Sequence, residues 1–274
     1  MRLEQAYQDK VVLITGGSSG IGKALALQLD ALGARLWLLA RRPQALAETQ
    51  AQMRGDCHVL AVDVSDWAQV QAALEQVQRL SGAPEVIINS AGMTRPGYVQ
   101  DLPVEVFRQM MEVNYLGTVH VVKAALPAMI ARGSGHIINI SSVAGFLGVF
   151  GYTAYGASKY AVRGFSDTLR AELKPLGIRV SIVFPPDTDT PQLAYEAPLK
   201  PPETKALAGN AGLLSPETVA RTILRAAARG RYIILPGLET KVLYHLNNLL
   251  GNGVYPLMDW LIARARRQRN SPTK

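Results

Sequence analysis

Short runs of consecutive apolar residues recur along the chain, and a longer segment with helical spacing follows each of them. Strands that are apolar on both sides have both faces buried, which is typical of a parallel sheet covered by helices. Crossovers of helix length pack back over the same sheet, so successive strands run parallel. The predicted strands span residues 11–15, 35–40, 58–62, 86–88, 136–140, 179–184 and 232–235. The sequence therefore predicts an α/β fold with a doubly wound parallel sheet, whose ligands bind at the carboxyl ends of the strands.

The composition favours one large domain followed by a short extension. The chain has 274 residues, of which 48% are hydrophobic and 18% are charged, a balance typical of a packed enzyme. Its formal net charge is +8, and residues 238–274 contribute half of it, with six basic residues against two acidic ones. We expect a single domain over residues 1–237 and an amphipathic, basic extension over residues 238–274.

The cysteine count and the N-terminal residues bear on metals and compartment. Cys57 is the only cysteine, which excludes an internal disulfide and a cysteine cluster that could hold a metal. Residues 1–10 carry charges among few apolar residues and lack the apolar run of a signal peptide. These features predict a cytoplasmic protein without a metal site.

A glycine-rich turn joins the first predicted strand to a helix expected at residues 23–32. The turn spans residues 15–22 and reads TGGSSGIG. Glycines permit positive φ and let a pyrophosphate approach the backbone, while the N–H groups at a helix N-terminus attract the anion. A plain tight turn is the alternative, but a position between a first strand and a helix favours phosphate binding. The pattern predicts a Rossmann-type dinucleotide site.

Two arginines, Arg41 and Arg42, follow the second predicted strand. Enzymes that prefer NAD place an acid there, against the ribose 2′-hydroxyl. Two guanidiniums can instead pair with a 2′-phosphate through charge-assisted, partly bidentate bonds. Solvated surface arginines are the alternative. We therefore expect NADPH as the cofactor.

A tyrosine and a lysine four residues apart, Tyr155 and Lys159, share one face of a predicted helix. A free phenol has a pKa of about 10, and a neighbouring ammonium favours the phenolate, which brings the pKa nearer to neutral pH. The pair suits general acid catalysis, although such a pair taken alone is usually an ordinary surface contact. Tyr155 is the predicted proton donor, and Lys159 is the residue expected to lower its pKa.

The spacing of these motifs resembles the short-chain dehydrogenase/reductase family. The glycines form the pattern TGxxxGxG, Ser142 lies thirteen residues before Tyr155, and Asn114 stands in a Val-Asn-Tyr-Leu-Gly segment. The resemblance implies that Ser142 hydrogen-bonds the substrate carbonyl and that Asn114 holds a water for a proton relay through Lys159. Ser141 is the structural neighbour of Ser142, and a structural helix break is the alternative for Asn114. The implied catalytic residues are Asn114, Ser142, Tyr155 and Lys159.

The same resemblance implies a set of cofactor-binding residues. Asp63 would contact the adenine, with helix capping within residues 63–66 as a second role, and the turn that begins at Asn89 would support the central sheet. The full implied set is Gly16, Ser18, Ser19, Gly20, Ile21, Gly22, Arg41, Arg42, Asp63, Val64, Asn89, Tyr155, Lys159, Thr188 and Thr190. The implied chemistry is hydride transfer from the nicotinamide to a ketone that Ser142 polarises and Tyr155 protonates.

The segment after the sixth predicted strand departs from the Pro-Gly that is common in the family. Residues 185–191 read PPDTDTP, residues 200–204 read KPPET, and residues 150–155 read FGYTAY. These segments resemble the 3-ketodihydrosphingosine (3-dehydrosphinganine) reductases within the family. The resemblance implies NADPH-dependent reduction of a long-chain 2-amino-3-ketone, 3-ketodihydrosphingosine, to dihydrosphingosine in sphingolipid synthesis. It also implies that Thr188 and Thr190 lie beside the nicotinamide.

Two other functions remain open from the residues alone. The first is reduction of another hydrophobic ketone, such as a 3-ketoacyl thioester or a steroid-like ketone. The second is a scaffold or sensor that binds NADP(H) without catalysis, although such a protein has no need for the catalytic residues together. A nucleic-acid partner is not expected, because the basic cluster lacks a binding motif and an aromatic platform.

Residues 185–215 and the C-terminal extension complete the predictions. The first segment is long and rich in Pro and Thr, which favours a substrate lid, with a variable surface loop as the alternative. Residues 242–258 lack Asp, Glu, Lys and Arg but are too short and too polar to cross a bilayer. Two amphipathic helices that end in an arginine cluster fit an interfacial anchor on anionic lipid, and equally fit packing on the protein core.

The family resemblance also implies a homodimer formed through residues 114–131 and 152–174. The expected partners are thus a keto-lipid substrate, a second copy of the chain and an anionic membrane surface. If the extension is an anchor, the protein is peripheral on the cytoplasmic face of the membrane.

Overall fold

Seven parallel strands form one sheet in the order β3-β2-β1-β4-β5-β6-β7. The computed structural model describes residues 3–208 and 212–270. The strands are β1 (Val11–Thr15), β2 (Arg35–Ala40), β3 (Cys57–Ala61), β4 (Val86–Asn89), β5 (Gly135–Ile140), β6 (Ile178–Val183) and β7 (Ile233–Ile234). The chain builds outward from β1 to β3 and then returns to place β4 on the other side of β1. Doubly wound folds bind their ligands where the order reverses in this way, outside the carboxyl ends of the strands.

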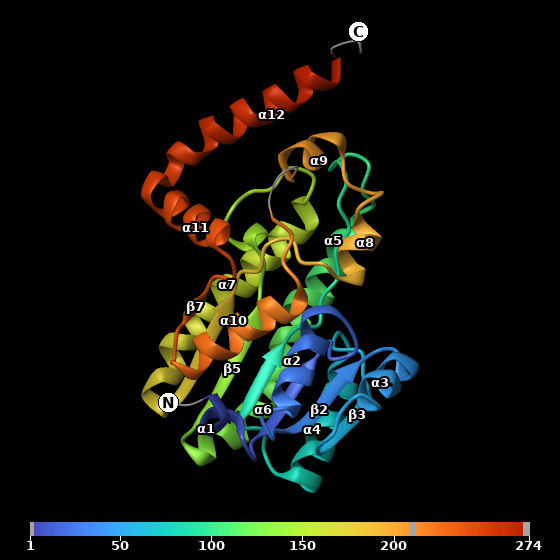
Figure 1. Cartoon of the computed structure of the whole chain (residues 1–274), viewed down its shortest axis with the longest axis vertical. Coiled ribbons are helices and arrows are strands. Elements are labelled where there is room, and N and C mark those ends of the chain that lie inside the picture. The colour runs from blue at the N-terminus through green and yellow to red at the C-terminus, as the bar shows by residue number, and fades with distance from the viewer. Residues whose placement is uncertain (1–2, 209–211, 271–274) are drawn as a thin grey trace.

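Alternate side chains of the strands enter two separate cores, because successive residues of a strand point to opposite faces. Val12 and Ile14 of β1 join the first core, whereas Val11 and Leu13 join the second. The first face is covered by α1 (Leu3–Tyr7), α2 (Gly20–Asp30), α3 (Pro43–Gln50) and α10 (Pro216–Ala228). The second face is covered by α4 (Trp67–Ser81), α6 (Gly117–Arg132) and α7 (Thr153–Leu173), so the sheet lies between two helical layers (Figure 1).

The predicted fold class is confirmed, and each predicted strand is present with small shifts of its ends. The third strand begins at Cys57 rather than at residue 58, and the fourth continues to Asn89. The helix expected from residue 23 begins earlier, at Gly20. Ser19 before it is extended, with φ −162°, so the glycine turn leads directly into the helix.

The lid segment, which we define as residues 185–215, contains two short helices, α8 (Pro191–Glu196) and α9 (Pro202–Ala208). Thr190 caps α8, since its side-chain oxygen accepts a hydrogen bond from the Leu193 amide at 3.3 Å. Thr188 pairs with Leu214 in a parallel β-bridge, which holds the two ends of the segment together. Residues 209–211 lie outside the described residues. The described part of the segment is therefore an ordered helical cover.

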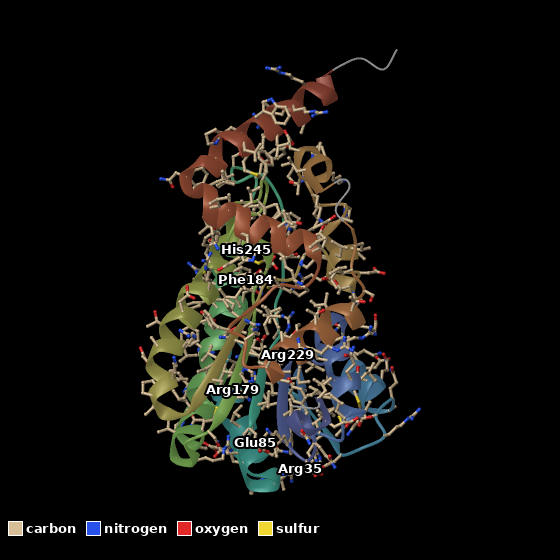
Figure 2. All side chains as sticks on the ribbon, turned by 60° about the vertical axis from the view of Figure 1, so that its left-hand side comes forward. Arg35, Glu85, Arg179, Phe184, Arg229 and His245 are labelled. Carbon is tan, nitrogen blue, oxygen red and sulfur yellow. The ribbon has the colours of Figure 1, made fainter. Side chains whose placement is uncertain are left out.

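The C-terminal extension forms two helices, α11 (Leu238–Leu250) and α12 (Val254–Asn270), separated by the turn Gly251–Gly253 (Figure 1). Tyr244 of α11 packs on Phe146 and Phe184, with ring centroids 5.1 and 5.8 Å away. Figure 2 shows Phe184 at the end of the sheet beneath His245 of α11. Packing on the core, one of the two alternatives from the sequence, is therefore present; Lys274, counted in the basic charge of the extension, lies outside the described residues.

The helix α12 also contacts the lid segment. Glu203 of α9 is 4% exposed and accepts hydrogen bonds from the Tyr98 hydroxyl at 2.7 Å and from Arg266 Nε at 3.2 Å. The Arg266 guanidinium also lies 5.6 Å from the centre of the Phe150 ring. These contacts connect the C-terminal helix to the lid segment and to the loop before α7.

One helical run within the described residues is long and apolar enough to span a membrane by length and composition. It covers residues 104–132 and comprises α5 (Val104–Met110), a π-helical turn (Met111–Leu116) and α6. Its side chains Val121, Val122 and Met129 belong to the second core. The run therefore packs on the sheet as a core helix does.

Candidate active site at the carboxyl edge of the sheet

The first two turns of α7 carry the tyrosine and the lysine. Lys159 is 5% exposed, and its ammonium donates a hydrogen bond to the carbonyl of Ile140 at 3.0 Å. The same nitrogen lies 5.6 Å from the centre of the Tyr155 ring. The structure thus brings together the two residues that the sequence paired, at the end of β5.

The two adjacent serines after β5 have different partners. The Ser141 hydroxyl is buried and donates to the backbone carbonyl of Lys159 at 3.0 Å. The Ser142 hydroxyl accepts from the Ala144 amide at 3.2 Å and is hydrogen-bonded to Tyr155. Ser142 therefore meets the phenol, whereas Ser141 fixes the backbone of α7.

The pKa of Tyr155 is raised above its ordinary value, contrary to the lowering that the sequence led us to expect from Lys159. Burial is the main cause, and the negative charges of Glu196 and Asp187 act in the same direction. Hydrogen bonds from Ser142 and Gln192 oppose this shift but are outweighed. A phenol that stays protonated near neutral pH is able to donate a proton.

Lys159 itself is shifted in the opposite direction. Burial lowers the pKa of its ammonium to about 8, because the charged form loses hydration inside the protein. The ammonium can therefore release and regain a proton close to physiological pH.

Asn114 lies in the π-helical turn between α5 and α6 and is 1% exposed. Its side-chain amide donates to the Ser158 hydroxyl at 2.9 Å and to the Met93 carbonyl at 3.0 Å, while its side-chain oxygen accepts from the Met93 amide at 2.8 Å. A π-helical turn is common at functional sites, and here it directs a polar side chain toward α7. Both the structural role and the predicted relay role are compatible with these contacts.

In the glycine turn, backbone atoms lie where side chains would otherwise be, which suits a site where a phosphate contacts the backbone. Gly16 has φ +70°, and a Cβ there would lie 2.8 Å from the Ser90 carbonyl oxygen. A Cβ at Gly22 would lie 2.3 Å from the Gly16 carbonyl oxygen. Ser19 makes no side-chain capping bond within the described residues, which leaves the first N–H groups of α2 directed at the turn. Ser18 and Ile21 are partly exposed along it.

The predicted adenosine-side residues lie at the ends of β2 and β3. Arg41 and Arg42 are both exposed directly after β2. The Asp63 carboxylate accepts from the Ser65 amide and hydroxyl at 3.0 and 2.7 Å. The cap of α4 is Asp66 rather than Asp63, since Asp66 accepts from the Gln69 amide at 3.1 Å. Asp63 therefore shapes the turn, and the neighbouring Val64 is buried.

Three further predicted cofactor residues have well-defined neighbours. The Asn89 side chain is buried and donates to the Asn139 side-chain oxygen at 2.9 Å, which ties β4 to β5. Thr190 stands against the glycine turn, because a Cβ at Gly20 would lie 3.0 Å from its methyl group. The Thr188 hydroxyl donates to the Pro186 carbonyl at 2.9 Å. The lid segment thus begins beside the turn expected to hold the phosphates.

Several residues near Tyr155 escaped the sequence analysis. Gln192 and Glu196 of α8 interact with the Tyr155 hydroxyl, the first by a hydrogen bond and the second by its charge. Lys200 lies 3.4 Å from a Glu196 oxygen and 3.3 Å from an Asp187 oxygen. The sequence contained a signal only for Asp187, within the unusual PPDTDTP segment.

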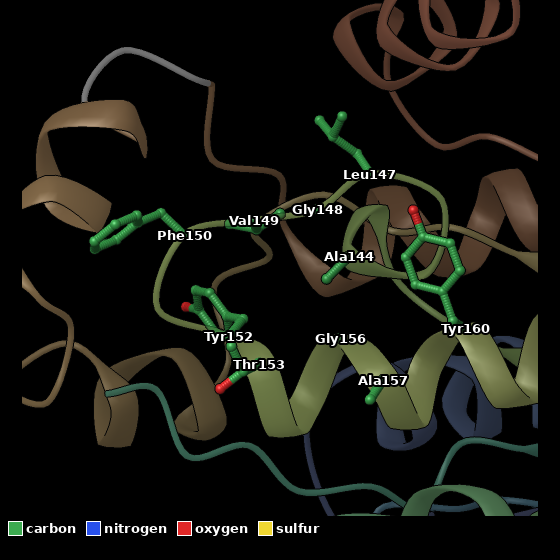
Figure 3. A pocket seen from close by; sticks show the side chains of 10 residues that line it. All are labelled: Ala144, Leu147, Gly148, Val149, Phe150, Tyr152, Thr153, Gly156, Ala157 and Tyr160. Carbon is green, nitrogen blue, oxygen red and sulfur yellow. The ribbon is translucent and has the colours of Figure 1, made fainter. Parts of the chain in front are cut away.

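An apolar-walled cavity of about 320 Å³ adjoins the start of α7 (Figure 3). Leu147, Val149, Phe150 and Tyr152 line it from the preceding loop, and Tyr160 lines it from the helix. Tyr155 is not part of the lining, so the cavity lies beside the tyrosine rather than around it.

The chain is similar to known proteins over most of its length. A family model described as short chain dehydrogenase matches residues 10–198. A 3-dehydrosphinganine reductase from Danio rerio is 40% identical over 229 residues, which cover 81% of this chain and 69% of that protein. A dehydrogenase/reductase SDR family member 7B from Xenopus tropicalis is 35% identical over 274 residues, which cover 96% of this chain and 87% of that protein.

A solved structure extends the similarity to the fold. The crystal structure of a short-chain dehydrogenase/reductase from Burkholderia phymatum in complex with NAD has a TM-score of 0.81 and 26% identity, and covers 98% of each chain. The range that the family model matches, residues 10–198, includes Tyr155, Ser142 and the glycine turn.

The buried ammonium of Lys159 makes stability depend on pH. Its pKa is about 8 in the folded protein against 10.5 for the free side chain, so between these values the unfolded chain binds more protons. Stability from this group therefore rises as the pH increases from 8 to 10.5, by about 3 kcal/mol. We expect the unfolding free energy of the wild type minus that of Lys159→Met, measured in urea, to increase by roughly this amount across the window.

The exposed Lys123 of α6 provides the matched control. The unfolding free energy of the wild type minus that of Lys123→Met should stay within about 0.5 kcal/mol of zero at pH 8 and at pH 10.5. A flat difference for Lys159→Met would show that the ammonium is hydrated in the folded protein.

Proposed function

The chain belongs to the short-chain dehydrogenase/reductase family, and from that premise we propose that it reduces 3-ketodihydrosphingosine to dihydrosphingosine with NADPH. The observation that carries the proposal is the meeting of the Ser142 and Tyr155 hydroxyls above buried Lys159, beside the glycine turn. The 40% identity with a relative named for this ketone supports the substrate. The unusual segment after β6, which forms the start of the lid, lies beside the same tyrosine.

The residues at the edge of the sheet fit a dinucleotide. Positive φ at Gly16 and the space kept free of a Cβ at Gly22 let an anion approach the backbone. The exposed pair Arg41 and Arg42 fits a 2′-phosphate, which is why we propose NADPH rather than NADH. When bound, this cofactor supplies the hydride for the carbonyl carbon.

The side chains of the protein supply orientation and the proton. The Ser142 hydroxyl hydrogen-bonds the ketone oxygen and draws it toward Tyr155. The protonated phenol of Tyr155 then donates its proton to that oxygen as negative charge develops there. Lys159 stabilises the resulting phenolate with its ammonium, and Asn114 with Ser158 provides polar groups for returning the proton. The lid segment excludes water from this reaction.

Two alternatives from the sequence remain distinguishable. The first is reduction of another hydrophobic ketone; a relative named only as an SDR family member, with no substrate in its name, covers 96% of this chain. A binding-only role has no use for the hydrogen-bonded serine and tyrosine. Turnover with 3-ketodihydrosphingosine but not with a 3-ketoacyl thioester would support the proposed reaction. Turnover with the thioester would support the first alternative, and turnover with neither would support a binding-only role.

Removing the phenolic hydroxyl tests the proton donor. We expect Tyr155→Phe to lower kcat for 3-ketodihydrosphingosine by a factor of about 100 or more, because general acid catalysis contributes roughly 10²–10⁴-fold. The dissociation constant for NADPH, measured by fluorescence titration, should change little. Tyr160→Phe serves as the control, since Tyr160 directly follows Lys159 on α7 and is 43% exposed. Full turnover in Tyr155→Phe would refute the assignment.

Exchanging the two arginines tests the choice of cofactor. We expect Arg41→Ser with Arg42→Ser to raise KM for NADPH at least about tenfold, because charge-assisted bonds to the 2′-phosphate are worth about 1.5–3 kcal/mol each. KM for NADH should be unchanged or lower. Arg54→Ser, an exposed arginine before β3, should alter neither value. Equal effects on both cofactors would contradict a contact with the 2′-phosphate.

The C-terminal helices support a second proposal, that the protein binds anionic membranes. Although α11 and α12 pack through Tyr244 and Val254, they leave many large apolar side chains exposed. These are Val242, Leu243, Leu246, Leu249, Leu250, Tyr255, Leu257 and Trp260. Exposed Arg264 lies over the Trp260 ring at 5.5 Å, so a cationic group adjoins one of these apolar side chains. Such a surface suits the boundary between lipid headgroups and acyl chains.

Liposome sedimentation tests this membrane proposal. We expect Val242→Ser with Leu249→Ser, at positions 56% and 83% exposed, to weaken pelleting with anionic vesicles at least about tenfold. Leu80→Ser on α4, 59% exposed, is the matched control and should pellet as the wild type does. Equal pelleting of both variants would refute the anchor. The homodimer through residues 114–131 and 152–174 stays a prediction.

A further inference from the structure

Two carboxylates beside the active site share a single lysine. Glu196, the last residue of α8, and Asp187, in the loop before that helix, both lie within ion-pair distance of Lys200 Nζ, at 3.4 and 3.3 Å. The side chains of Glu196 and Lys200 are each 8% exposed, whereas that of Asp187 is 45% exposed. With all three groups ionised, one negative charge is left over, and Asp187 is the carboxylate that a ligand can reach.

This surplus charge acts on the proton donor. Glu196 is hydrogen-bonded to Tyr152, whose ring centroid lies 5.7 Å from that of Tyr155. The charges of Glu196 and Asp187 both act to raise the pKa of the Tyr155 phenol. This negative charge keeps the phenol protonated before the reaction, but it opposes formation of the phenolate as the proton leaves. A cation bound between the carboxylates and the phenol would remove the penalty.

We propose that Asp187 binds a primary ammonium group of the substrate, and that Glu196, acting through Lys200, maintains the negative charge of this subsite. The inference rests on the proposed function, in which the substrate is a 2-amino-3-ketone. Its nitrogen is two bonds from the carbonyl carbon, so a ketone oxygen held by Ser142 and Tyr155 places the ammonium close to the tyrosine. Asp187 is therefore a specificity-determining residue that separates amino ketones from ketones without nitrogen.

A pair of ketones tests this subsite. The first is 3-ketodihydrosphingosine, and the second is the same chain with hydrogen in place of the amino group. We expect the wild type to prefer the amino ketone in kcat/KM by about tenfold or more, because a hydrogen bond to a charged group is worth about 1.5–3 kcal/mol. Asp187→Asn should remove most of that preference, through a higher KM for the amino ketone and an unchanged or higher kcat for the other ketone, because the charge that opposes release of the Tyr155 proton is gone.

The chain provides a matched control and a second variant. Asp189 is an exposed carboxylate in the same loop, two residues further on, and Asp189→Asn should keep the full preference. Glu196→Gln should reduce the preference in the same direction as Asp187→Asn. Because Asp187 is exposed, its exchange for the isosteric amide leaves the packing of the lid intact even if Glu196→Gln disturbs it.

Binding without turnover separates this inference from the proposed reaction. Calorimetry would use a short-chain 2-amino-1,3-diol and the same diol without the amine. Asp187→Asn should bind the amino diol about tenfold more weakly than the wild type does, whereas the two proteins should bind the diol without the amine equally. Equal kcat/KM for the two ketones in the wild type, or equal losses in Asp187→Asn, would overturn the ammonium subsite while the reductase function stands. If the wild type reduces neither ketone, the proposed function fails, and the calorimetric comparison alone decides the subsite.

Discussion

The attachment of α7 to the end of β5 is the constraint on which the site depends. The Ile140 carbonyl accepts a hydrogen bond from the Lys159 ammonium, and the Ser141 hydroxyl donates one to the Lys159 carbonyl. Two consecutive residues of the chain therefore fix both the side chain and the backbone of one lysine. Gly145 allows this close approach, since a Cβ there would lie 2.2 Å from the Ser141 hydroxyl and 2.9 Å from the Lys159 carbonyl oxygen. With the helix fixed in this way, the next residue, Ser142, reaches the phenol of Tyr155. This geometry buries the charge of the Lys159 ammonium, and it does so where proton transfer is proposed.

The parts that surround this attachment come from distant points of the chain. The lid segment touches the glycine turn through Thr190 and contacts the C-terminal helix through Glu203 and Arg266. Through Phe150, which lies under the Arg266 guanidinium, the same helix contacts the loop that walls the cavity beside α7. The helix α12, which carries exposed apolar side chains, thus also contacts the active-site cover. This arrangement would place a membrane-bound lipid next to the lid.

Much of the architecture followed from patterns local to the sequence, whereas the chemistry of the site depended on contacts that the sequence hides. Apolar runs and the glycine turn predicted the sheet and its ligand edge, because strand burial and positive φ at Gly16 leave clear signals. The four-residue spacing of Tyr155 and Lys159 predicted their shared face but not the burial that raises the pKa of the tyrosine. Helices α8 and α9 were too short to show a period. Glu196 and Gln192 belong to no motif, and the contact of Arg266 with Glu203 joins residues 63 positions apart.

The central claim is that this edge of the sheet reduces a ketone by adding one hydride to its carbonyl carbon and one proton to its oxygen. The most direct measurement is mass spectrometry of the product formed from 3-ketodihydrosphingosine and NADPH that carries deuterium at the transferable position of C4. We expect dihydrosphingosine with one deuterium, located on carbon 3. Unlabelled product, or unchanged ketone together with unchanged NADPH, would contradict the account.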